Sequence, residues 1–127
     1  MIRPIAALAA ILFCAGAAYA DPVEGSWKTE VDDGNYAIIS MKTCGAKLCG
    51  TIARTFNSAG EFKSEVIGRQ LVWDMVPEGG GAYGDGKIWR PSNDKVYRSK
   101  MKLSGNSLKV SGCFGPVCLG QHWTRVQ

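Results

Sequence analysis

Residue patterns that usually carry catalysis are missing from this chain. It has a single histidine, His122, and contains neither a G-x-S-x-G nucleophile elbow nor an H-E-x-x-H metal motif. No C-x-x-C pair is present, and that spacing is the usual one for thiol redox catalysis. His122 belongs to a predicted strand and precedes Trp123, so we expect it to be a surface residue or to pack against its neighbours. These absences predict a protein that is not an enzyme and that carries no metal or cofactor.

Three carboxylates near a glycine run come closest to an acid–base pair. Asp74, Glu78 and Asp85 surround Gly79-Gly80-Gly81 in the sequence, and paired carboxylates can transfer protons when a scaffold fixes them. The sequence provides no fixed scaffold around them, so we expect solvated loop charges. Asp32-Asp33-Gly34 lacks the further ligands of a calcium loop and is typical of a hairpin turn.

The charge of the chain is weakly patterned. Its formal net charge is +4, and the basic residues are scattered without a run or an interleaved aromatic stripe. A nucleic-acid partner is therefore poorly supported. After residue 20 no apolar run is long enough to span a membrane.

The first 20 residues, MIRPIAALAAILFCAGAAYA, have the composition of a secretory signal peptide. A positive start and an apolar stretch precede the small-x-small cleavage site Ala18-Tyr19-Ala20. A retained anchor helix is one alternative, and lipidation at Cys14 is another, although Phe13 is not the small residue expected before a lipidated cysteine. We predict that residues 1–20 are cleaved, that residues 21–127 form one domain, and that the protein is periplasmic or secreted.

Four cysteines then remain, in two C-x4-C units: Cys44 with Cys49, and Cys113 with Cys118. An even count in an oxidising compartment favours disulfides. A zinc site is the rival, but its cysteine pairs more often have a two-residue spacing. Each unit flanks the turn of a predicted hairpin, so we predict the local pairs Cys44–Cys49 and Cys113–Cys118. Crossed pairing is the alternative, and it requires the two turns to be neighbours.

No stretch of the chain shows sustained helical periodicity. Short β-prone runs alternate instead with Gly, Asn, Asp and Pro, which is typical of an antiparallel β domain. About eight strands with short turns predict a small up-and-down β-barrel, because closure removes exposed sheet edges. Residues 56–63 read as turn-like, and the glycine-rich segment from Pro77 to Gly84 reads as a flexible loop or rim. The strands are predicted at residues 26–31, 36–42, 47–55, 68–75, 86–90, 95–103, 103–110 and 120–126.

Residues 96–103 alternate clearly between two faces. Arg98, Lys100 and Lys102 share one face of the predicted strand. The opposite face carries Tyr97, Ser99, Met101 and Leu103. This pattern indicates a strand with one side in a core and the other in solvent.

The two ends of the mature chain resemble the lipocalin-like barrels. Gly25-Ser26-Trp27 opens the first predicted strand and Trp123-Thr124-Arg125 closes the last. In those barrels a G-x-W on the first strand meets an arginine from the last strand. The resemblance implies that Arg125 stacks on Trp27 through a cation–π contact and plugs one end of the barrel.

A resemblance over nearly the whole mature chain is to the small secreted bacterial family known as domain of unknown function 2147. The resemblance implies a lipocalin-like or calycin-type barrel in an exported bacterial protein, and it implies no reaction. The glycine-rich segment from Met75 to Asp85 departs from the family pattern. The elements that carry the resemblance are Gly25 to Trp27, Cys44 to Gly50, Gly68 to Leu71, Gly86 to Pro91, Val96-Tyr97, Leu108 to Cys113 and Trp123 to Val126.

Aromatic residues of the middle strands are the candidate ligand-binding groups. Amphipathic rings at a barrel mouth can hold an apolar ligand and supply one or two hydrogen bonds, although such rings can equally fill the core. The leading hypothesis is an exported, non-enzymatic binding protein for a small apolar or amphipathic ligand. The alternative is a module that binds an exported protein, such as a protease or hydrolase inhibitor, through residues 21–24 or the segment from Pro77 to Gly84. The candidate ligand-binding residues are Trp73, Tyr83, Trp89, Tyr97 and Met101.

Overall fold

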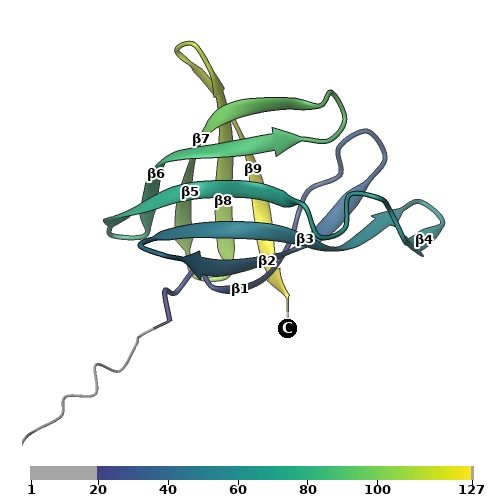
Figure 1. The fold of residues 1–127 in the computed structure, drawn as a ribbon, viewed down its shortest axis with the longest axis horizontal. Helices are drawn as coiled ribbons and strands as arrows, with labels where there is room; N and C mark the ends of the chain where they lie inside the picture. The colour runs from purple at the N-terminus through teal and green to yellow at the C-terminus, as the bar shows by residue number, and fades with distance from the viewer. Residues whose placement is uncertain (1–19, 127) are drawn as a thin grey trace, which may run out of the picture.

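The protein is built from β-strands. A computed structural model describes residues 20–126, and no helix occurs among them (Figure 1). Residues 1–19 of the predicted signal peptide, including Cys14, therefore lie outside the described residues. The strands are β1 (Gly25–Lys28), β2 (Tyr36–Cys44), β3 (Lys47–Asn57), β4 (Gly60–Phe62), β5 (Gln70–Gly79), β6 (Ala82–Arg90), β7 (Lys95–Ser104), β8 (Ser107–Phe114) and β9 (Val117–Val126).

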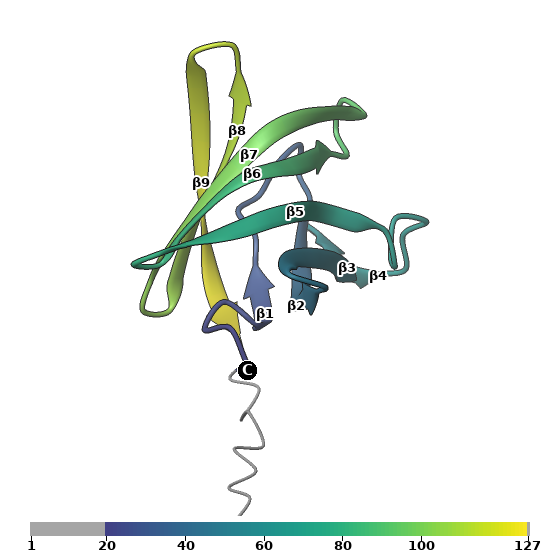
Figure 2. The same ribbon diagram turned by 60° about the vertical axis from the view of Figure 1, so that its left-hand side comes forward.

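Eight of these strands form a closed antiparallel barrel. The hydrogen-bonded order is β2-β1-β9-β8-β7-β6-β5-β3, and a further pairing of β2 with β3 closes the ring (Figures 1 and 2). β4 lies outside the ring as a short strand paired only with β3. The prediction of an up-and-down barrel of about eight strands is confirmed. β4 falls within residues 56–63, so the prediction that this segment is turn-like is wrong for Gly60–Phe62, which pairs with β3.

The glycine-rich segment from Pro77 to Gly84 is a tight hairpin and not an extended loop, which corrects the loop alternative of the prediction. Pro77 pairs with Tyr83 across β5 and β6, and only Gly80 and Gly81 lie between the two strands. Both glycines have positive φ, 63° and 82°, which side chains other than glycine rarely adopt. Glycine predicts flexibility and tight turns alike, and here the strands on either side continue to the turn.

Both cysteine pairs form the local disulfides that their spacing predicted. Cys113 and Cys118 are directly opposed on β8 and β9. Cys44 and Cys49 lie on β2 and β3 with Cα atoms 5.9 Å apart. Each disulfide therefore ties the two strands of one hairpin together next to its turn.

The inside of the barrel differs between its two ends. Around Met41 and Val72 the interior is solid, since a Cβ atom added to Gly50 would lie 2.5 Å from the Met41 sulfur and 2.8 Å from a Val72 methyl carbon. On β7, Ser99 and Met101 are buried and the intervening basic residues are exposed, as the alternation predicted. The other end of the barrel is hollow and forms the candidate site.

Candidate functional site

The closed end of the barrel is sealed by Trp27 and Arg125. They are cross-strand partners on β1 and β9, and the guanidinium carbon lies 4.4 Å from the centre of the indole ring. The predicted stack is therefore present. The guanidinium also donates to the carbonyl oxygens of Glu24, at 2.9 Å, and Pro22, at 2.6 Å. Arg125 thus covers the indole and holds the chain that precedes β1.

Residues 21–24 are bound to this closed end. Val23 is fully buried, and its carbonyl oxygen accepts a hydrogen bond of 2.8 Å from the Trp27 indole nitrogen. The Tyr83 hydroxyl donates to the Asp21 carboxylate. Burial, followed by the bond to Asp21, raises the pKa of Tyr83 far above its ordinary value. Tyr83 therefore stays protonated and continues to donate this bond.

A cavity of about 850 Å³ occupies the other end of the barrel. The buried side chains of its wall are apolar except for Thr55, and charged side chains gather around the opening, which we call the mouth. Such a distribution favours a ligand with an apolar body and a polar end. The apolar wall includes Ile52, Val66, Leu71, Ile88, Trp89, Val110 and Trp123, and the polar groups include Thr29, Glu30, Asp32, Asp33, Asn35, Arg90, Ser92, Lys95, Tyr97 and Gln121.

Two of the five candidate ligand-binding residues line this cavity. Trp89 and Tyr97 belong to its wall and mouth. Tyr83 lies at the closed end, Met101 is buried in the core, and Trp73 is half-buried opposite the exposed Lys87. These three positions are not among the cavity-lining residues.

Sequence reasoning missed most of the cavity wall. Trp123 lies between two exposed residues of β9, so its inward position was readable from the pattern. Ile88 and Val110 each have one exposed and one buried neighbour, so burial there does not follow a strict alternation. Alternation does not indicate which half of a strand faces a hollow interior. That depends on how side chains from opposite walls fill the barrel.

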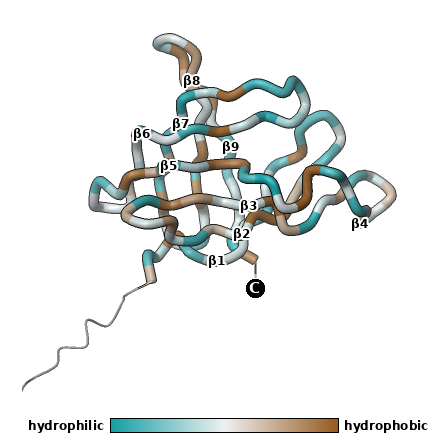
Figure 3. The backbone as a smooth tube through the Cα atoms, in the orientation of Figure 1, coloured by the Kyte–Doolittle hydropathy of each residue, from teal (hydrophilic) through white to brown (hydrophobic). Residues whose placement is uncertain are grey.

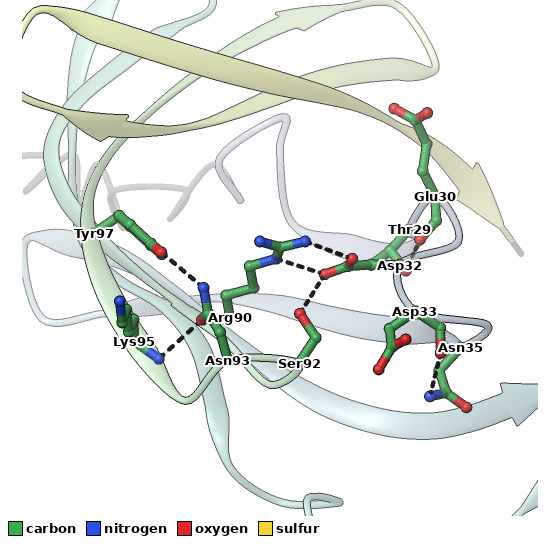
Figure 4. Close-up of polar contacts among 10 residues, drawn as sticks. All are labelled: Thr29, Glu30, Asp32, Asp33, Asn35, Arg90, Ser92, Asn93, Lys95 and Tyr97. Atoms are coloured by element: carbon green, nitrogen blue, oxygen red, sulfur yellow. Dashed lines mark hydrogen bonds and ion pairs between the residues drawn. The ribbon is translucent and has the colours of Figure 1, made fainter.

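Trp89 and Tyr97, the two candidate residues that line the cavity, are both held in place by polar neighbours. The Trp89 indole nitrogen donates to Asp94 at 2.8 Å, and the Arg69 guanidinium lies 3.6 Å from the centre of the Trp89 ring. The Tyr97 hydroxyl accepts a 2.8 Å hydrogen bond from the Asn93 side chain (Figure 4). Side chains fixed in this way present preformed surfaces to a ligand.

The loop between β1 and β2 is tied to the far side of the mouth. Arg90, at the end of β6, donates to both carboxylate oxygens of Asp32 at 2.8 and 2.9 Å, and the Ser92 hydroxyl donates at 3.0 Å (Figure 4). β6 lies opposite β1 in the ring of strands. The Asp32 carboxylate therefore joins two loops from opposite walls of the barrel.

The charge state of this tie follows from its partners. The hydrogen bonds from Arg90 lower the pKa of Asp32 below its ordinary value, with a smaller contribution in the same direction from Ser92. The same pairing raises the pKa of Arg90. Both groups are therefore charged at neutral pH.

Replacing Asp32 with Asn is expected to loosen the β1–β2 loop. The amide groups at positions 32 and 35 donate to each other's carbonyl oxygens, at 2.8 and 3.1 Å. Hydrogen exchange at these two amides should become about tenfold faster in Asp32→Asn, because the loop loses its charged tie to Arg90. Asp33→Asn is the matched control, since no side-chain hydrogen bond of Asp33 is found within residues 20–126. If hydrogen exchange became faster by the same factor in both variants, the Asp32–Arg90 pair would not be what holds the loop.

The pH dependence of this effect has a definite sign. Because the folded-state pKa of Asp32 is lowered, its contribution is fully present above the ordinary carboxyl range and is lost as the pH falls below about 4. The difference in exchange protection between the protein and Asp32→Asn should therefore be constant from about pH 5 to 8. It should disappear in more acidic solution.

The residues considered for catalysis lie apart from the cavity. His122 is exposed on β9, where its backbone amide donates to Glu30 at 2.6 Å. Asp74, Glu78 and Asp85 are exposed on β5 and β6 and are not among the lining residues. Within residues 20–126, no group of three or more His, Cys, Asp or Glu side chains is placed to hold a metal ion.

Comparisons with known proteins agree with the barrel. The family model described as "Uncharacterized protein conserved in bacteria (DUF2147)" matches residues 25–125. One similar solved structure is protein HP1028 from the human pathogen Helicobacter pylori, described as belonging to the lipocalin family. The two chains are 14% identical, 82% of each is covered, and the TM-score is 0.65. No curated protein sequence matches the chain.

Proposed function

The chain belongs to the DUF2147 family of bacterial proteins, and we propose that it is an exported, non-enzymatic protein that binds a small apolar or amphipathic molecule in the barrel cavity. The observation that carries the proposal is the cavity of about 850 Å³, with its apolar wall and its polar mouth. This volume lies within the range of about 300–1,000 Å³ that is usual for small-molecule sites.

The mouth indicates how such a ligand would be oriented. Ile52, Leu71 and Val110 would contact its apolar part. Its polar end would reach the mouth, where Lys95 and the Tyr97 hydroxyl lie. The Arg90 side chain is already paired with Asp32, so it is less available to a ligand.

Two observations support export. The four cysteines of residues 21–127 form disulfides, which persist in oxidising compartments such as the periplasm or the extracellular space. The composition of residues 1–20 supplies the signal expected for that route. No helix long and apolar enough to cross a membrane occurs in the part of the chain that the structure describes.

The alternative of a protein-binding module receives less support. Residues 21–24, one of its two contact candidates, are bound to the closed end through Val23 and Arg125. The segment from Pro77 to Gly84 is a tight hairpin whose turn accepts a hydrogen bond from the Leu103 amide at 2.7 Å. Neither segment is a free loop of the kind that inhibitors commonly insert into an enzyme.

Native mass spectrometry of the protein, purified gently from its own compartment, tests the proposal. We expect a stoichiometric small molecule that is released when the protein unfolds. In parallel, the emptied protein should bind 8-anilinonaphthalene-1-sulfonate, a fluorescent probe with an apolar body and an anionic end. Repeated failure to find a bound molecule, together with no saturable probe binding, would exclude the carrier function.

A further inference from the structure

The hairpin end formed by residues 113–119, which we call the β8–β9 tip, exposes large apolar side chains. Phe114, Val117 and Leu119 are 80%, 56% and 76% exposed. In Figure 2 this hairpin projects beyond the other turns at its end of the barrel, and in Figure 3 it is the brown-shaded turn at the top. Contiguous exposed apolar groups of this kind usually mark an interaction surface.

The apolar face of the tip continues the inner wall of the cavity. Phe114 is paired with Val117, and Leu119 is paired with Gly112, which lines the cavity. Cross-strand partners point to the same face of a sheet, so these side chains belong to the inward face. All three apolar tip residues also border the mouth. An apolar track therefore runs from the cavity to the end of the hairpin.

The wall beneath the tip is basic. All 11 acidic side chains of the chain lie at or before Asp94, so residues 95–127, which include β7, β8 and β9, contain six basic residues and no acidic one. These three strands are neighbours in the barrel. On their exposed face lie Arg98, Lys100, Lys102 and Lys109. The apolar tip thus projects from three strands whose own charged side chains are all basic, although Glu30 of the β1–β2 loop contacts β9 at the His122 amide.

The tip is also held in a fixed shape. The Cys113–Cys118 disulfide joins its two strands. The Arg98 guanidinium donates a 2.6 Å hydrogen bond to the carbonyl oxygen of Gly115 in the turn. A loop that is already ordered loses little conformational entropy when it binds.

We propose that the β8–β9 tip docks the protein on an anionic lipid bilayer. The apolar side chains Phe114, Val117 and Leu119 enter the interface between headgroups and acyl chains, and Arg98 and Lys100 face the anionic headgroups. A narrow projecting apolar end beside cations suits a bilayer, which accepts such a group without a matching pocket. Docked in this way, the tip residues that border the mouth contact the lipid. The apolar track could then carry a ligand between the lipid and the cavity, and this step rests on the proposed function. The docking itself does not depend on the proposed function.

Co-sedimentation with lipid vesicles tests the docking. The full-length mature chain with both disulfides formed should bind vesicles of phosphatidylcholine containing about one-third phosphatidylglycerol, and should bind pure phosphatidylcholine weakly. Replacing both Phe114 and Leu119 with Ser should lower the partition coefficient at least about tenfold. Lys100→Gln should lower it about fivefold, because one cation near the surface is removed.

Two matched variants show whether the loss of vesicle binding is specific to the tip and the basic wall, or follows from removing any exposed apolar or basic side chain. Val31 is 66% exposed on the acidic β1–β2 loop, so Val31→Ser should leave vesicle binding unchanged. Lys63→Gln removes a cation outside the basic wall and should have little effect. Circular dichroism and the urea midpoint would confirm that the double tip variant is folded. Loss of binding in a folded double variant, with both matched variants unaffected, supports the docking.

A reporter at the tip gives an independent measurement. Phe114→Trp should shift its emission to the blue on anionic vesicles and should be quenched by brominated acyl chains, whereas Val31→Trp should show neither change. The proposal would be overturned if the protein did not bind vesicles or if the tip variants bound them as well as the unchanged protein. It would also be overturned if the tip captured a soluble protein in place of lipid. Probe binding measured without vesicles decides the cavity function separately, so either conclusion can fail alone.

Discussion

Replacing Trp27 with Ala is expected to lower the free energy of unfolding by about 3–5 kcal/mol. Trp27 is fully buried and is the largest side chain at the closed end. Its loss would leave a cavity, remove the surface on which the Arg125 guanidinium stacks and leave the Val23 carbonyl oxygen without its indole donor. Small domains are stable by only about 5–15 kcal/mol, so this single change removes much of the total.

Urea denaturation followed by circular dichroism measures this effect. Trp73→Ala is the matched control, because Trp73 is half-buried and has no role in closing the barrel. Trp73→Ala should lower the free energy of unfolding by clearly less than Trp27→Ala does. Arg125→Lys keeps the charge but loses the planar stack, and it should cost about 1 kcal/mol. If Trp27→Ala is no more destabilising than Trp73→Ala, the closed end does not depend on this stack.

The parts of the fold that local patterns control could be predicted from the sequence. Alternation of the β7 residues identified the face that carries Met101, and the spacing of Cys113 and Cys118 across a short turn identified their disulfide. The Trp27–Arg125 contact joins the first and last strands of the barrel, and it was predicted only through the resemblance to lipocalin-like barrels. Signals confined to neighbouring residues do not contain that contact.

The cavity could be predicted only in part, for a physical reason. Tyr83 and Trp89 lie on the same strand and look equivalent as aromatic candidates, yet Tyr83 seals the closed end and Trp89 lines the hollow one. The difference arises from packing across the barrel. At the solid end a Cβ at position 50 would clash with Met41 and Val72, whereas at position 112 it would make ordinary contacts beside the cavity. Both glycines look alike in the sequence.

The same contrast yields the prediction with the largest effect on binding. Replacing Gly112 with Leu should fill part of the cavity and lower the affinity for the anionic naphthalene probe at least about tenfold. A Cβ atom at Gly112 would lie 3.4 Å from a methyl carbon of Ile88 and 3.6 Å from the Tyr97 Cβ, which are ordinary contact distances. Position 112 therefore accommodates a Cβ atom, and because it lines the cavity we expect the rest of the leucine side chain to occupy space that a ligand would use. Titration of probe fluorescence gives the change in affinity.

Two matched glycine variants show whether occupied volume is the cause. Gly112→Ala adds one methyl group at the same position and should leave probe affinity nearly unchanged. Gly50→Ala adds the same methyl group at the solid end, where it would crowd Met41 and Val72, and it should destabilise the fold by about 1–3 kcal/mol. Gly112→Leu should unfold at a urea concentration close to that of the unchanged protein, because its Cβ makes only ordinary van der Waals contacts. Undiminished probe binding by a folded Gly112→Leu variant would place the binding site outside the barrel and remove the main support for a carrier.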